Sequence, residues 1–287
     1  MPVETLTFTV GRDGGPVDAG ADLHPVTLAH TRTGSGEPLL LVHGIGHHGA
    51  AWDPVLPALR ARHEVIAVDL PGFGDSPSLP GALRYDIPTV ARVLGAFAEE
   101  LGLERPHVAG NSLGGLLALR LGHENAVRSV TALSPAGFSP GWEQTYLFAV
   151  LGALHATSRL LPERAIRSLA RSAAGRWALT STIYARPGRR DPAATVAEVL
   201  SLRGCTDFAR ARTGCLTTRF ADPVTGPPVT IAWGDRDRLL LPRQGTRAQL
   251  AVPGAEFIRL GGCGHVPMND DPELVARVLL EGAGRGR

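Results

Sequence analysis

The chain has 287 residues, of which 44% are hydrophobic and 20% charged, and its formal net charge is +2. This composition excludes a disordered chain and predicts a well-packed globular protein with one large domain or two ordinary ones. All 29 basic residues are arginines, but no basic stripe stands out, so we expect no nucleic-acid binding.

The N-terminal segment, MPVETLTFTV, lacks the basic start and long apolar run of a signal peptide. The most apolar segment, residues 146–156, is about half as long as a membrane span requires. Three cysteines (Cys205, Cys215 and Cys263) are too few for a disulfide framework, although spacing leaves a Cys205–Cys215 bridge open. An odd number of cysteines fits a reducing compartment. We therefore expect a cytoplasmic protein that enters no membrane.

Short apolar runs alternate with amphipathic segments along most of the chain. Eight runs have the character of strands: residues 5–10, 25–31, 38–44, 64–70, 107–112, 129–137, 228–234 and 256–262. Helical periodicity marks residues 50–62, 88–103, 114–126 and 272–281. This alternation predicts the α/β class, with a mostly parallel eight-stranded sheet flanked by helices. The first two runs have no helix between them, so we expect them to form an antiparallel edge.

The alternation stops between Phe138 and Asp222, where several helices follow one another without strands. The predicted helices cover residues 141–156, 162–179, 191–202 and 204–213. An all-helical block inserted into an alternating pattern predicts a cap, or lid, over the carboxyl edge of the sheet. We assign residues 139–220 to this cap and residues 1–138 and 221–287 to the core.

One serine lies between two glycines where a predicted strand meets a helix, in Gly110-Asn111-Ser112-Leu113-Gly114. In this context G-x-S-x-G predicts a sharp turn that exposes the serine hydroxyl, with glycines where a side chain would collide with its neighbours. The helix N-terminus offers the Leu113 N–H to a developing oxyanion. Taken alone, the motif could also be a glycine-rich turn with an incidental serine.

A serine nucleophile needs a base, and the base needs a carboxylate that orients it. The segment TIAWGDRDRLLLP carries Asp235 and Asp237 directly after a predicted strand. His265 follows in a glycine-rich loop after the last strand. The order Ser…Asp…His matches that of a nucleophile elbow, and both aspartates could reach the histidine.

The segments LLLVHGIG, VIAVDLPGFGDSP, VAGNSLGG, IAWGDRDRLLLP and GCGHVPMNDDPELV resemble those of capped α/β-hydrolases, and the resemblance covers nearly the whole chain. It implies an α/β-hydrolase fold and a triad of Ser112, Asp237 and His265. In the family pattern the acid lies three residues after the strand-ending glycine, which favours Asp237 over Asp235. The resemblance also implies that Ile45 and Leu113 supply the two oxyanion-hole N–H groups.

Other polar residues near these motifs have structural interpretations. We expect His43 to hold its loop by hydrogen bonding and Asp69 to fix the turn after its strand. His43, His47 and His48 lie on a glycine-rich loop without supporting carboxylates or cysteines, so we expect no metal site. Cys263 is interpreted as a small buried residue. The expected chemistry needs no cofactor.

The resemblance implies a hydrolase that cleaves a small to medium apolar carboxylic ester, thioester or lactone through an acyl-enzyme, as in small-ester hydrolases and perhydrolases. Dehalogenases and epoxide hydrolases are excluded because they carry an aspartate in place of Ser112. We expect a small-molecule substrate as the partner and leave a homodimer open. Candidate substrate-binding residues are Phe138, Trp142, Arg190, Leu239 and Val266.

Two alternatives remain open at this point. Carbon–carbon bond hydrolases of meta-cleavage products share the G-N-S-x-G-G elbow, and Arg190 could bind a carboxylate of such a substrate. Against this, the segment HGIGHHG and Val266 depart from their pattern of HGGGPG and an aromatic residue after the histidine. The second alternative is a small-molecule receptor with residual hydrolase activity, which an intact triad disfavours.

Overall fold

The computed structural model of the protein describes residues 2–16 and 22–286. Eight strands form one sheet in the order β1-β2-β4-β3-β5-β6-β7-β8. The strands are β1 Glu4–Val10, β2 His24–Gly34, β3 Glu37–Val42, β4 His63–Val68, β5 His107–Asn111, β6 Ser129–Leu133, β7 Val229–Gly234 and β8 Glu256–Leu260. Strand β2 pairs antiparallel with both β1 and β4, and the remaining neighbours are parallel. The predicted eight-stranded, mostly parallel sheet with an antiparallel edge is confirmed.

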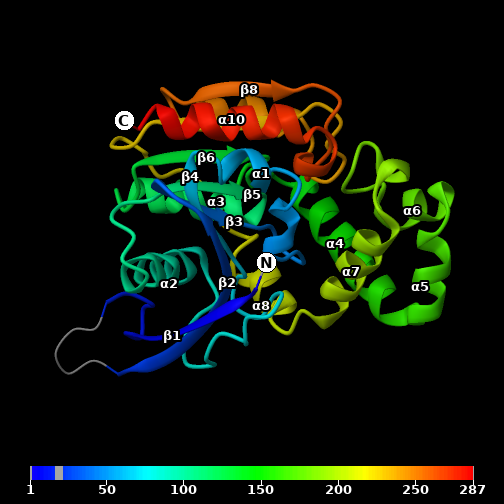
Figure 1. Ribbon diagram of the computed structural model, residues 1–287, viewed down its shortest axis with the longest axis horizontal. Coiled ribbons are helices and arrows are strands. Elements are labelled where there is room, and N and C mark those ends of the chain that lie inside the picture. The colour runs from blue at the N-terminus through cyan, green and yellow to red at the C-terminus, as the bar shows by residue number, and fades with distance from the viewer. Residues whose placement is uncertain (1, 17–21, 287) are drawn as a thin grey trace.

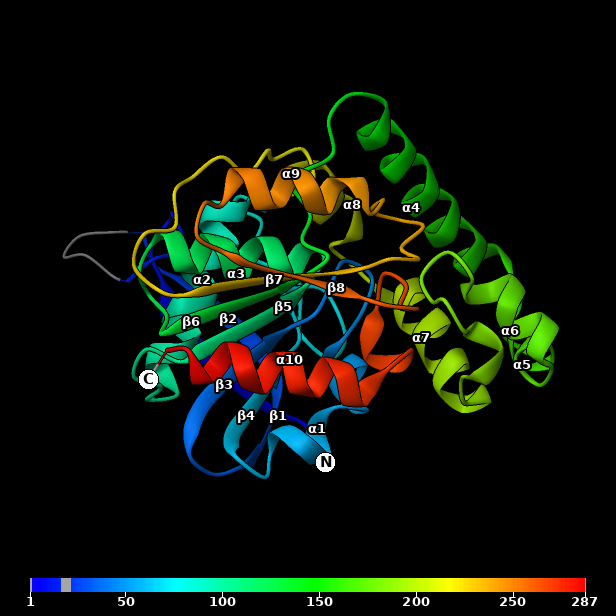
Figure 2. The same cartoon turned by 90° about the horizontal axis from the view of Figure 1, so that it is seen from above.

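Helices cover both faces of the sheet, and Figure 2 shows α2, α3 and α9 on one side and α1 and α10 on the other. Their bounds are α1 Leu56–Leu59, α2 Ile87–Glu100, α3 Leu113–His123, α9 Arg243–Ala251 and α10 Pro272–Gly284. Each face has its own apolar cluster, the larger one around α2 and α3 and the smaller one around α1 and α10. The central strands β5, β6 and β7 are buried along their whole length, which explains their continuous apolar sequence.

Two core helices differ from the sequence prediction. The predicted helix 50–62 is only a 3₁₀ turn, Gly49–Trp52, followed by the single turn α1, because Pro54 and Pro57 cannot continue a helix from the residues before them. Helix α9 was not predicted, since its sequence RQGTRAQLA has little apolar periodicity. A glycine, Gly245, lets this helix approach the sheet, since a Cβ there would lie 2.9 Å from the Phe257 ring.

The insertion after β6 contains helices and no strand in its described residues, and most of it forms the lobe on the right of Figure 1. Its helices are α4 Trp142–Leu160, α5 Glu163–Ala170, α6 Ala173–Thr180, α7 Pro192–Gly204 and α8 Phe208–Gly214. The predicted helix 162–179 is divided in two, because Ser172 caps α6 by accepting a hydrogen bond from the Gly175 N–H at 3.0 Å. Ile166, Ala170, Val196 and Val199 form a small apolar cluster within the lobe.

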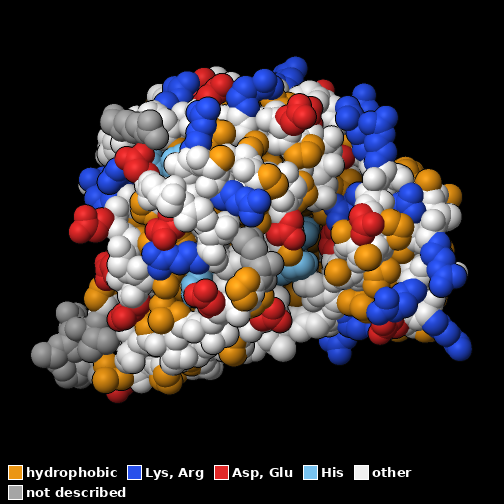
Figure 3. Space-filling model, viewed as in Figure 1, with side chains coloured by type: hydrophobic (Ala, Val, Ile, Leu, Met, Phe, Trp, Pro, Cys, Tyr) orange, Lys and Arg blue, Asp and Glu red, His pale blue; other side chains and the backbone are white. Residues whose placement is uncertain are grey.

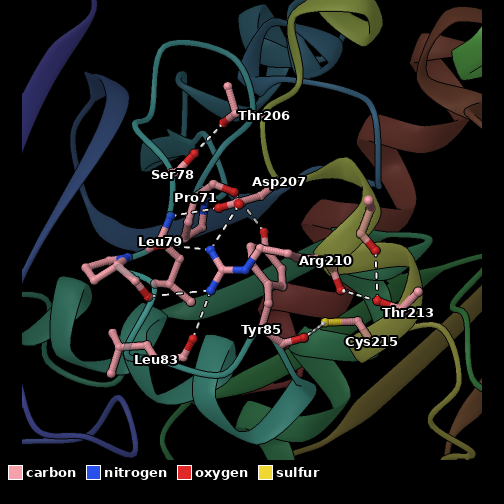
Figure 4. Close-up of polar contacts among 12 residues, drawn as sticks. Pro71, Ser78, Leu79, Leu83, Tyr85, Thr206, Asp207, Arg210, Thr213 and Cys215 are labelled. Atoms are coloured by element: carbon pink, nitrogen blue, oxygen red, sulfur yellow. Dashed lines mark hydrogen bonds and ion pairs between the residues drawn. The ribbon is translucent and has the colours of Figure 1, made fainter.

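The last part of the insertion packs on the core rather than projecting with α4–α7. Figure 4 shows Asp207 and Arg210 of this segment directed at the loop before α2. The buried Asp207 carboxylate accepts from the Leu79 N–H at 2.7 Å and from Arg210 at 3.0 Å, and Arg210 also donates to the Leu83 carbonyl at 2.9 Å. The Tyr85 hydroxyl beside them donates to the Pro71 carbonyl at 2.9 Å. The projecting part of the predicted cap, 139–220, therefore ends near the C-terminus of α7.

The described part of the chain offers no helix whose length and apolar character would suit crossing a bilayer. Cys205 and Cys215, for which spacing left a bridge open, are both buried free thiols. Cys263 is also buried, and burial raises the pKa of its thiol to about 12, which agrees with its interpretation as a small buried residue.

Candidate active site

Ser112 occupies the turn between β5 and α3 with a backbone φ of 58° and ψ of −115°. An L-residue rarely adopts such a positive φ, so the surrounding structure must hold it there. The Ser112 N–H donates to the Leu133 carbonyl at 2.9 Å, and its carbonyl accepts from Leu116 and Ala136 at 3.1 and 3.0 Å. These bonds tie the strained residue to the neighbouring strand β6 and to the first turn of α3.

The flanking glycines are required by close backbone approach. A Cβ on Gly110 would lie 2.0 Å from the Gly114 carbonyl oxygen, and a Cβ on Gly114 would lie 2.1 Å from the Val42 carbonyl oxygen. Any side chain at either position would push α3 away from β5 or β3. The sequence explanation of the two glycines as collision points therefore agrees with the geometry.

Asp237 and His265 form a buried, hydrogen-bonded pair. The Asp237 Oδ2 atom accepts from His265 Nδ1 at 2.8 Å, and its Oδ1 atom accepts from the Leu239 and Leu240 N–H groups, each at 2.9 Å. The two backbone bonds fix the carboxylate, so that its free oxygen faces the imidazole. This bond makes Nδ1 the protonated nitrogen and leaves Nε2 as an acceptor.

The other aspartate after β7 has a different partner. Asp235 Oδ1 accepts from the Gly262 N–H at 2.7 Å, which fastens the start of the loop that carries His265. The structure therefore brings Asp237, and not Asp235, to the histidine.

No hydrogen bond joins the Ser112 hydroxyl to His265 among the residues that the structure describes. The two are linked instead through Asn111, whose side-chain amide donates to the His265 carbonyl at 2.9 Å and to the Leu133 carbonyl at 3.1 Å. The His265 N–H donates to the Ile183 carbonyl of the cap at 2.7 Å. Catalytic hydrogen bonds of the serine–histidine kind often tighten only when substrate binds.

The backbone amides of Ile45 and Leu113 border the serine turn. Leu113 is the first residue of α3, whose N-terminal N–H groups lack intrahelical partners. Ile45 follows Gly44, and a Cβ on Gly44 would lie 3.0 Å from Ser112 Cβ, so this loop lies against the serine. Within the described residues, neither the Ile45 nor the Leu113 N–H donates a hydrogen bond.

His43 and Asp69 hold the loops beneath these amides. His43 donates from Nδ1 to the Gly44 carbonyl at 2.7 Å and accepts from the Leu70 N–H through Nε2 at 2.9 Å. Burial lowers the pKa of His43 to about 4, consistent with a neutral ring that donates once and accepts once. Asp69 accepts from the Gly49 and Asp75 N–H groups at 2.6 and 2.9 Å. Both roles agree with the structural interpretation of the sequence.

The side chains of the histidine-rich loop are engaged in other contacts. Both His43 ring nitrogens are occupied by backbone groups. Among residues 2–16 and 22–286, no group of three or more His, Cys, Asp or Glu side chains could hold a metal ion.

A cavity of about 470 Å³ lies between the Ile45 loop and the cap, and its walls are mainly aliphatic. Figure 3 shows histidine side chains at the seam between the core and the cap lobe. The lining residues are Ile45, Gly46, His47, Val150, Leu151, Ala153, Leu154, Thr157, Ser158, Leu161, Leu169, Ala178, Leu179, Thr180, Thr182, Ile183, Glu198, Val199 and Leu202. A second hollow, of about 620 Å³, lies beside α2 and contains none of the candidate catalytic residues in its described lining.

The five predicted substrate-binding residues lie elsewhere than in the described lining of this cavity. Phe138 packs on Phe220 in the core, and Leu239 and Val266 are buried. Trp142 is 62% exposed at the start of α4. Arg190 is paired with Glu198 of α7 at 2.6 Å. Most of the wall comes instead from α4, α6 and α7, whose inward faces no sequence motif marks.

The chain is similar to known proteins in both sequence and fold. The model of a family described as the alpha/beta hydrolase family matches residues 39–278. Over 111 residues, 38% of this chain and 42% of the relative, the chain is 42% identical to a pimeloyl-[acyl-carrier protein] methyl ester esterase of Aeromonas hydrophila. The match thus spans less than half of that relative's length.

Two solved structures are similar over most of their length. A bacterial membrane phospholipase A is 26% identical with a TM-score of 0.66, covering 98% of this chain and 87% of that one. A meta-cleavage product hydrolase of Pseudomonas fluorescens has a TM-score of 0.73 at 19% identity, covering 91% and 96%. The second likeness is one of fold alone.

Proposed function

Because the chain belongs to the alpha/beta hydrolase family, we propose that it is a serine hydrolase that cleaves small to medium apolar carboxylic esters. The observation that carries the proposal is the buried 2.8 Å bond between Asp237 and His265, beside a serine held at a strained elbow. Strain of this kind persists where the surrounding structure enforces it, and such sites are often functional.

In the proposed reaction, Ser112 Oγ attacks the ester carbonyl carbon while His265 Nε2 takes the hydroxyl proton. Asp237 keeps the imidazole in the reactive tautomer and stabilises its cation. The Ile45 and Leu113 N–H groups donate to the carbonyl oxygen as it becomes an anion, and loss of one such donor typically costs about 10²–10³-fold in rate.

The tetrahedral intermediate collapses, and His265 gives its proton to the departing alcohol. Water then attacks the acyl-enzyme, with His265 as its base, and releases the carboxylic acid and free Ser112. His265 Nε2 thus accepts and returns the transferred proton in both acylation and deacylation.

The aliphatic cavity under the cap supports an acyl chain as its occupant. It begins at Ile45, one of the proposed oxyanion donors, and continues between α4, α6 and α7. Pockets of this size and apolar character are typical of small-molecule sites. The esterase relative from Aeromonas hydrophila gives independent support for ester cleavage.

Carbon–carbon bond cleavage receives less support from the described contacts. The Arg190 guanidinium, which could have bound a substrate carboxylate, pairs through Nη2 with Glu198 at 2.6 Å and stacks over the Tyr184 ring, 3.8 Å from its centroid. A 2-hydroxy-6-oxo-dienoate should therefore keep its colour in the presence of the protein.

Hydrolysis of p-nitrophenyl butyrate and octanoate tests the proposal. We expect turnover by the wild-type protein and a loss of at least about 10³-fold in kcat/KM for Ser112→Ala, because the nucleophile is gone. Turnover that survives this substitution would contradict the assignment of Ser112.

A further inference from the structure

One wall of the aliphatic cavity carries a buried carboxylate. Glu198 on α7 is 6% exposed, and it lines the cavity together with Ile45, Gly46 and His47. A carboxylate buried to this degree requires compensation by partners. Two donors compensate the Oε2 atom of Glu198, whereas the Oε1 atom has no hydrogen-bond donor among the described residues.

The Oε2 atom of Glu198 is fully engaged. It accepts from the Tyr184 hydroxyl at 2.9 Å and from Arg190 Nη2 at 2.6 Å. The Arg190 charge balances that of the carboxylate, although burial raises the pKa of Glu198. Both partners of this oxygen are therefore donors.

The Oε1 atom of Glu198 accepts no hydrogen bond from any residue in the described part of the chain. His47 Nε2 lies 3.6 Å from it, and the same nitrogen lies 3.3 Å from the Tyr184 hydroxyl oxygen. Burial lowers the pKa of His47 well below its ordinary value, so this ring is neutral. One carboxylate oxygen on the cavity wall thus remains an unused acceptor.

A neutral hydrogen-bond donor suits this oxygen best. A cation would find the charge of Glu198 already balanced by Arg190, whereas a carbonyl or carboxylate would set its lone pairs against those of Oε1. A hydroxyl donates to a carboxylate strongly, with a net gain larger than that of a neutral pair.

The neighbourhood of Ile45 indicates where that hydroxyl lies on the substrate. His47, whose Nε2 atom is 3.6 Å from Glu198 Oε1, follows Ile45 by two residues, so the two Cα atoms are at most about 7 Å apart, and both residues line the cavity. We propose that Glu198 Oε1 binds a hydroxyl on the second or third carbon of the acyl chain, so that the preferred substrates are hydroxyacyl esters. This inference rests on the proposed ester hydrolysis, and it names the substrate class.

The substitution Glu198→Gln separates this role from a purely structural one. Because both partners of Oε2 donate, the amide oxygen of the variant takes the place of Oε2, and the NH₂ group takes that of Oε1. The cavity wall then presents a donor of nearly the same size where it presented an acceptor. A residue that only ties the cap to the core would affect all esters alike.

The readout is kcat/KM for matched pairs of methyl esters, 3-hydroxyoctanoate against 3-oxooctanoate and 2-hydroxyoctanoate against 2-oxooctanoate. Intrinsic reactivities cancel when one pair is compared across variants. We expect the hydroxy-to-oxo ratio of at least one pair to fall about tenfold or more in Glu198→Gln. The matched control is Glu163→Gln on α5, an exposed cap glutamate paired with Arg167, which should leave both ratios unchanged.

Binding to the Ser112→Ala variant gives a second measurement that needs no turnover. Calorimetric titration should show the preferred hydroxy ester binding about tenfold tighter than its oxo partner. Esters that are hydrolysed with unchanged ratios in Glu198→Gln would overturn the hydroxyl site and leave the hydrolase proposal standing. Binding preference without hydrolysis would overturn the hydrolase proposal instead.

The double variant Glu198→Met with Arg190→Met covers the case in which Glu198→Gln fails to fold. It removes both buried charges together, which is better tolerated than removing one. Its hydroxy-to-oxo ratio should also fall about tenfold, and an unchanged ratio in this folded variant would equally overturn the proposal.

Discussion

The substitution Gly114→Ala tests whether close packing at the elbow positions the reacting groups. A Cβ at this position would lie 2.1 Å from the Val42 carbonyl oxygen and 2.6 Å from that of His43. Contacts between a Cβ and such an atom below 3.0 Å essentially do not occur, so α3 and the end of β3 must separate by about 1 Å. Both proposed oxyanion donors, Ile45 and Leu113, lie on the segments that would separate.

We expect this change to lower the free energy of unfolding by about 2–3 kcal/mol, the upper part of the range for overpacking, because the clash is with backbone. For a protein of this size the Tm should fall by roughly 4–12 °C. Displacement of catalytic groups by about 1 Å can cost 10²-fold in rate, so kcat/KM should fall by a similar factor.

Thermal unfolding by circular dichroism and ester hydrolysis measure the two effects. The control is Gly95→Ala in α2, where a Cβ meets nothing within 4 Å. Replacing this helical glycine should raise stability by about 0.5–1 kcal/mol and leave kcat/KM unchanged. A Gly114→Ala variant with the Tm and kcat/KM of the wild type would refute the reasoning.

Two further predictions concern the groups around the serine. Asp237→Asn should reduce kcat by about 10³–10⁴-fold without loss of fold, whereas Asp235→Asn should keep kcat within tenfold; equal losses would contradict the assignment of the acid. Because burial lowers the pKa of His43 from 6.5 to about 4, the unfolded chain takes up this proton first as pH falls. The stability that His43 provides is thus complete above pH 6.5 and is lost towards pH 4, by up to about 3 kcal/mol. Urea unfolding of His43→Gln should accordingly show a shallower decline between pH 7 and 4, and an unchanged slope would contradict the neutral buried ring.

The strands and the elbow could be predicted from the sequence because their determinants are local. Buried parallel strands show as continuous apolar runs, and the spacing of Gly110, Ser112 and Gly114 between a predicted strand and a predicted helix indicates a sharp turn. Loop positions at one sheet edge left both Asp235 and Asp237 open as partners of His265, and the resemblance to capped α/β-hydrolases favoured Asp237, which the structure pairs with the histidine. Helix α9 was not predicted because its sequence has little apolar periodicity. Its contact with the sheet depends on the absence of a side chain at Gly245, and an apolar pattern does not show this.

The lining of the cavity under the cap could not be predicted, because it depends on how the cap helices lie over the core. An aliphatic residue such as Leu154 or Val199 has the same local pattern whether it faces a cavity or a packed interior. Trp142 and Arg190 were predicted to bind substrate, but Trp142 is 62% exposed and Arg190 is paired with Glu198. Glu198 is a polar residue on the cavity wall, but the residues next to it in α7 form no motif that would indicate a site.

Covalent labelling of Ser112 tests the central claim most directly. The protein is incubated with a fluorophosphonate, and its intact mass and labelled peptide are determined by mass spectrometry. We predict one equivalent of label on the peptide containing Ser112 and none on Ser112→Ala. Label on another residue, or undiminished labelling of Ser112→Ala, would contradict the account.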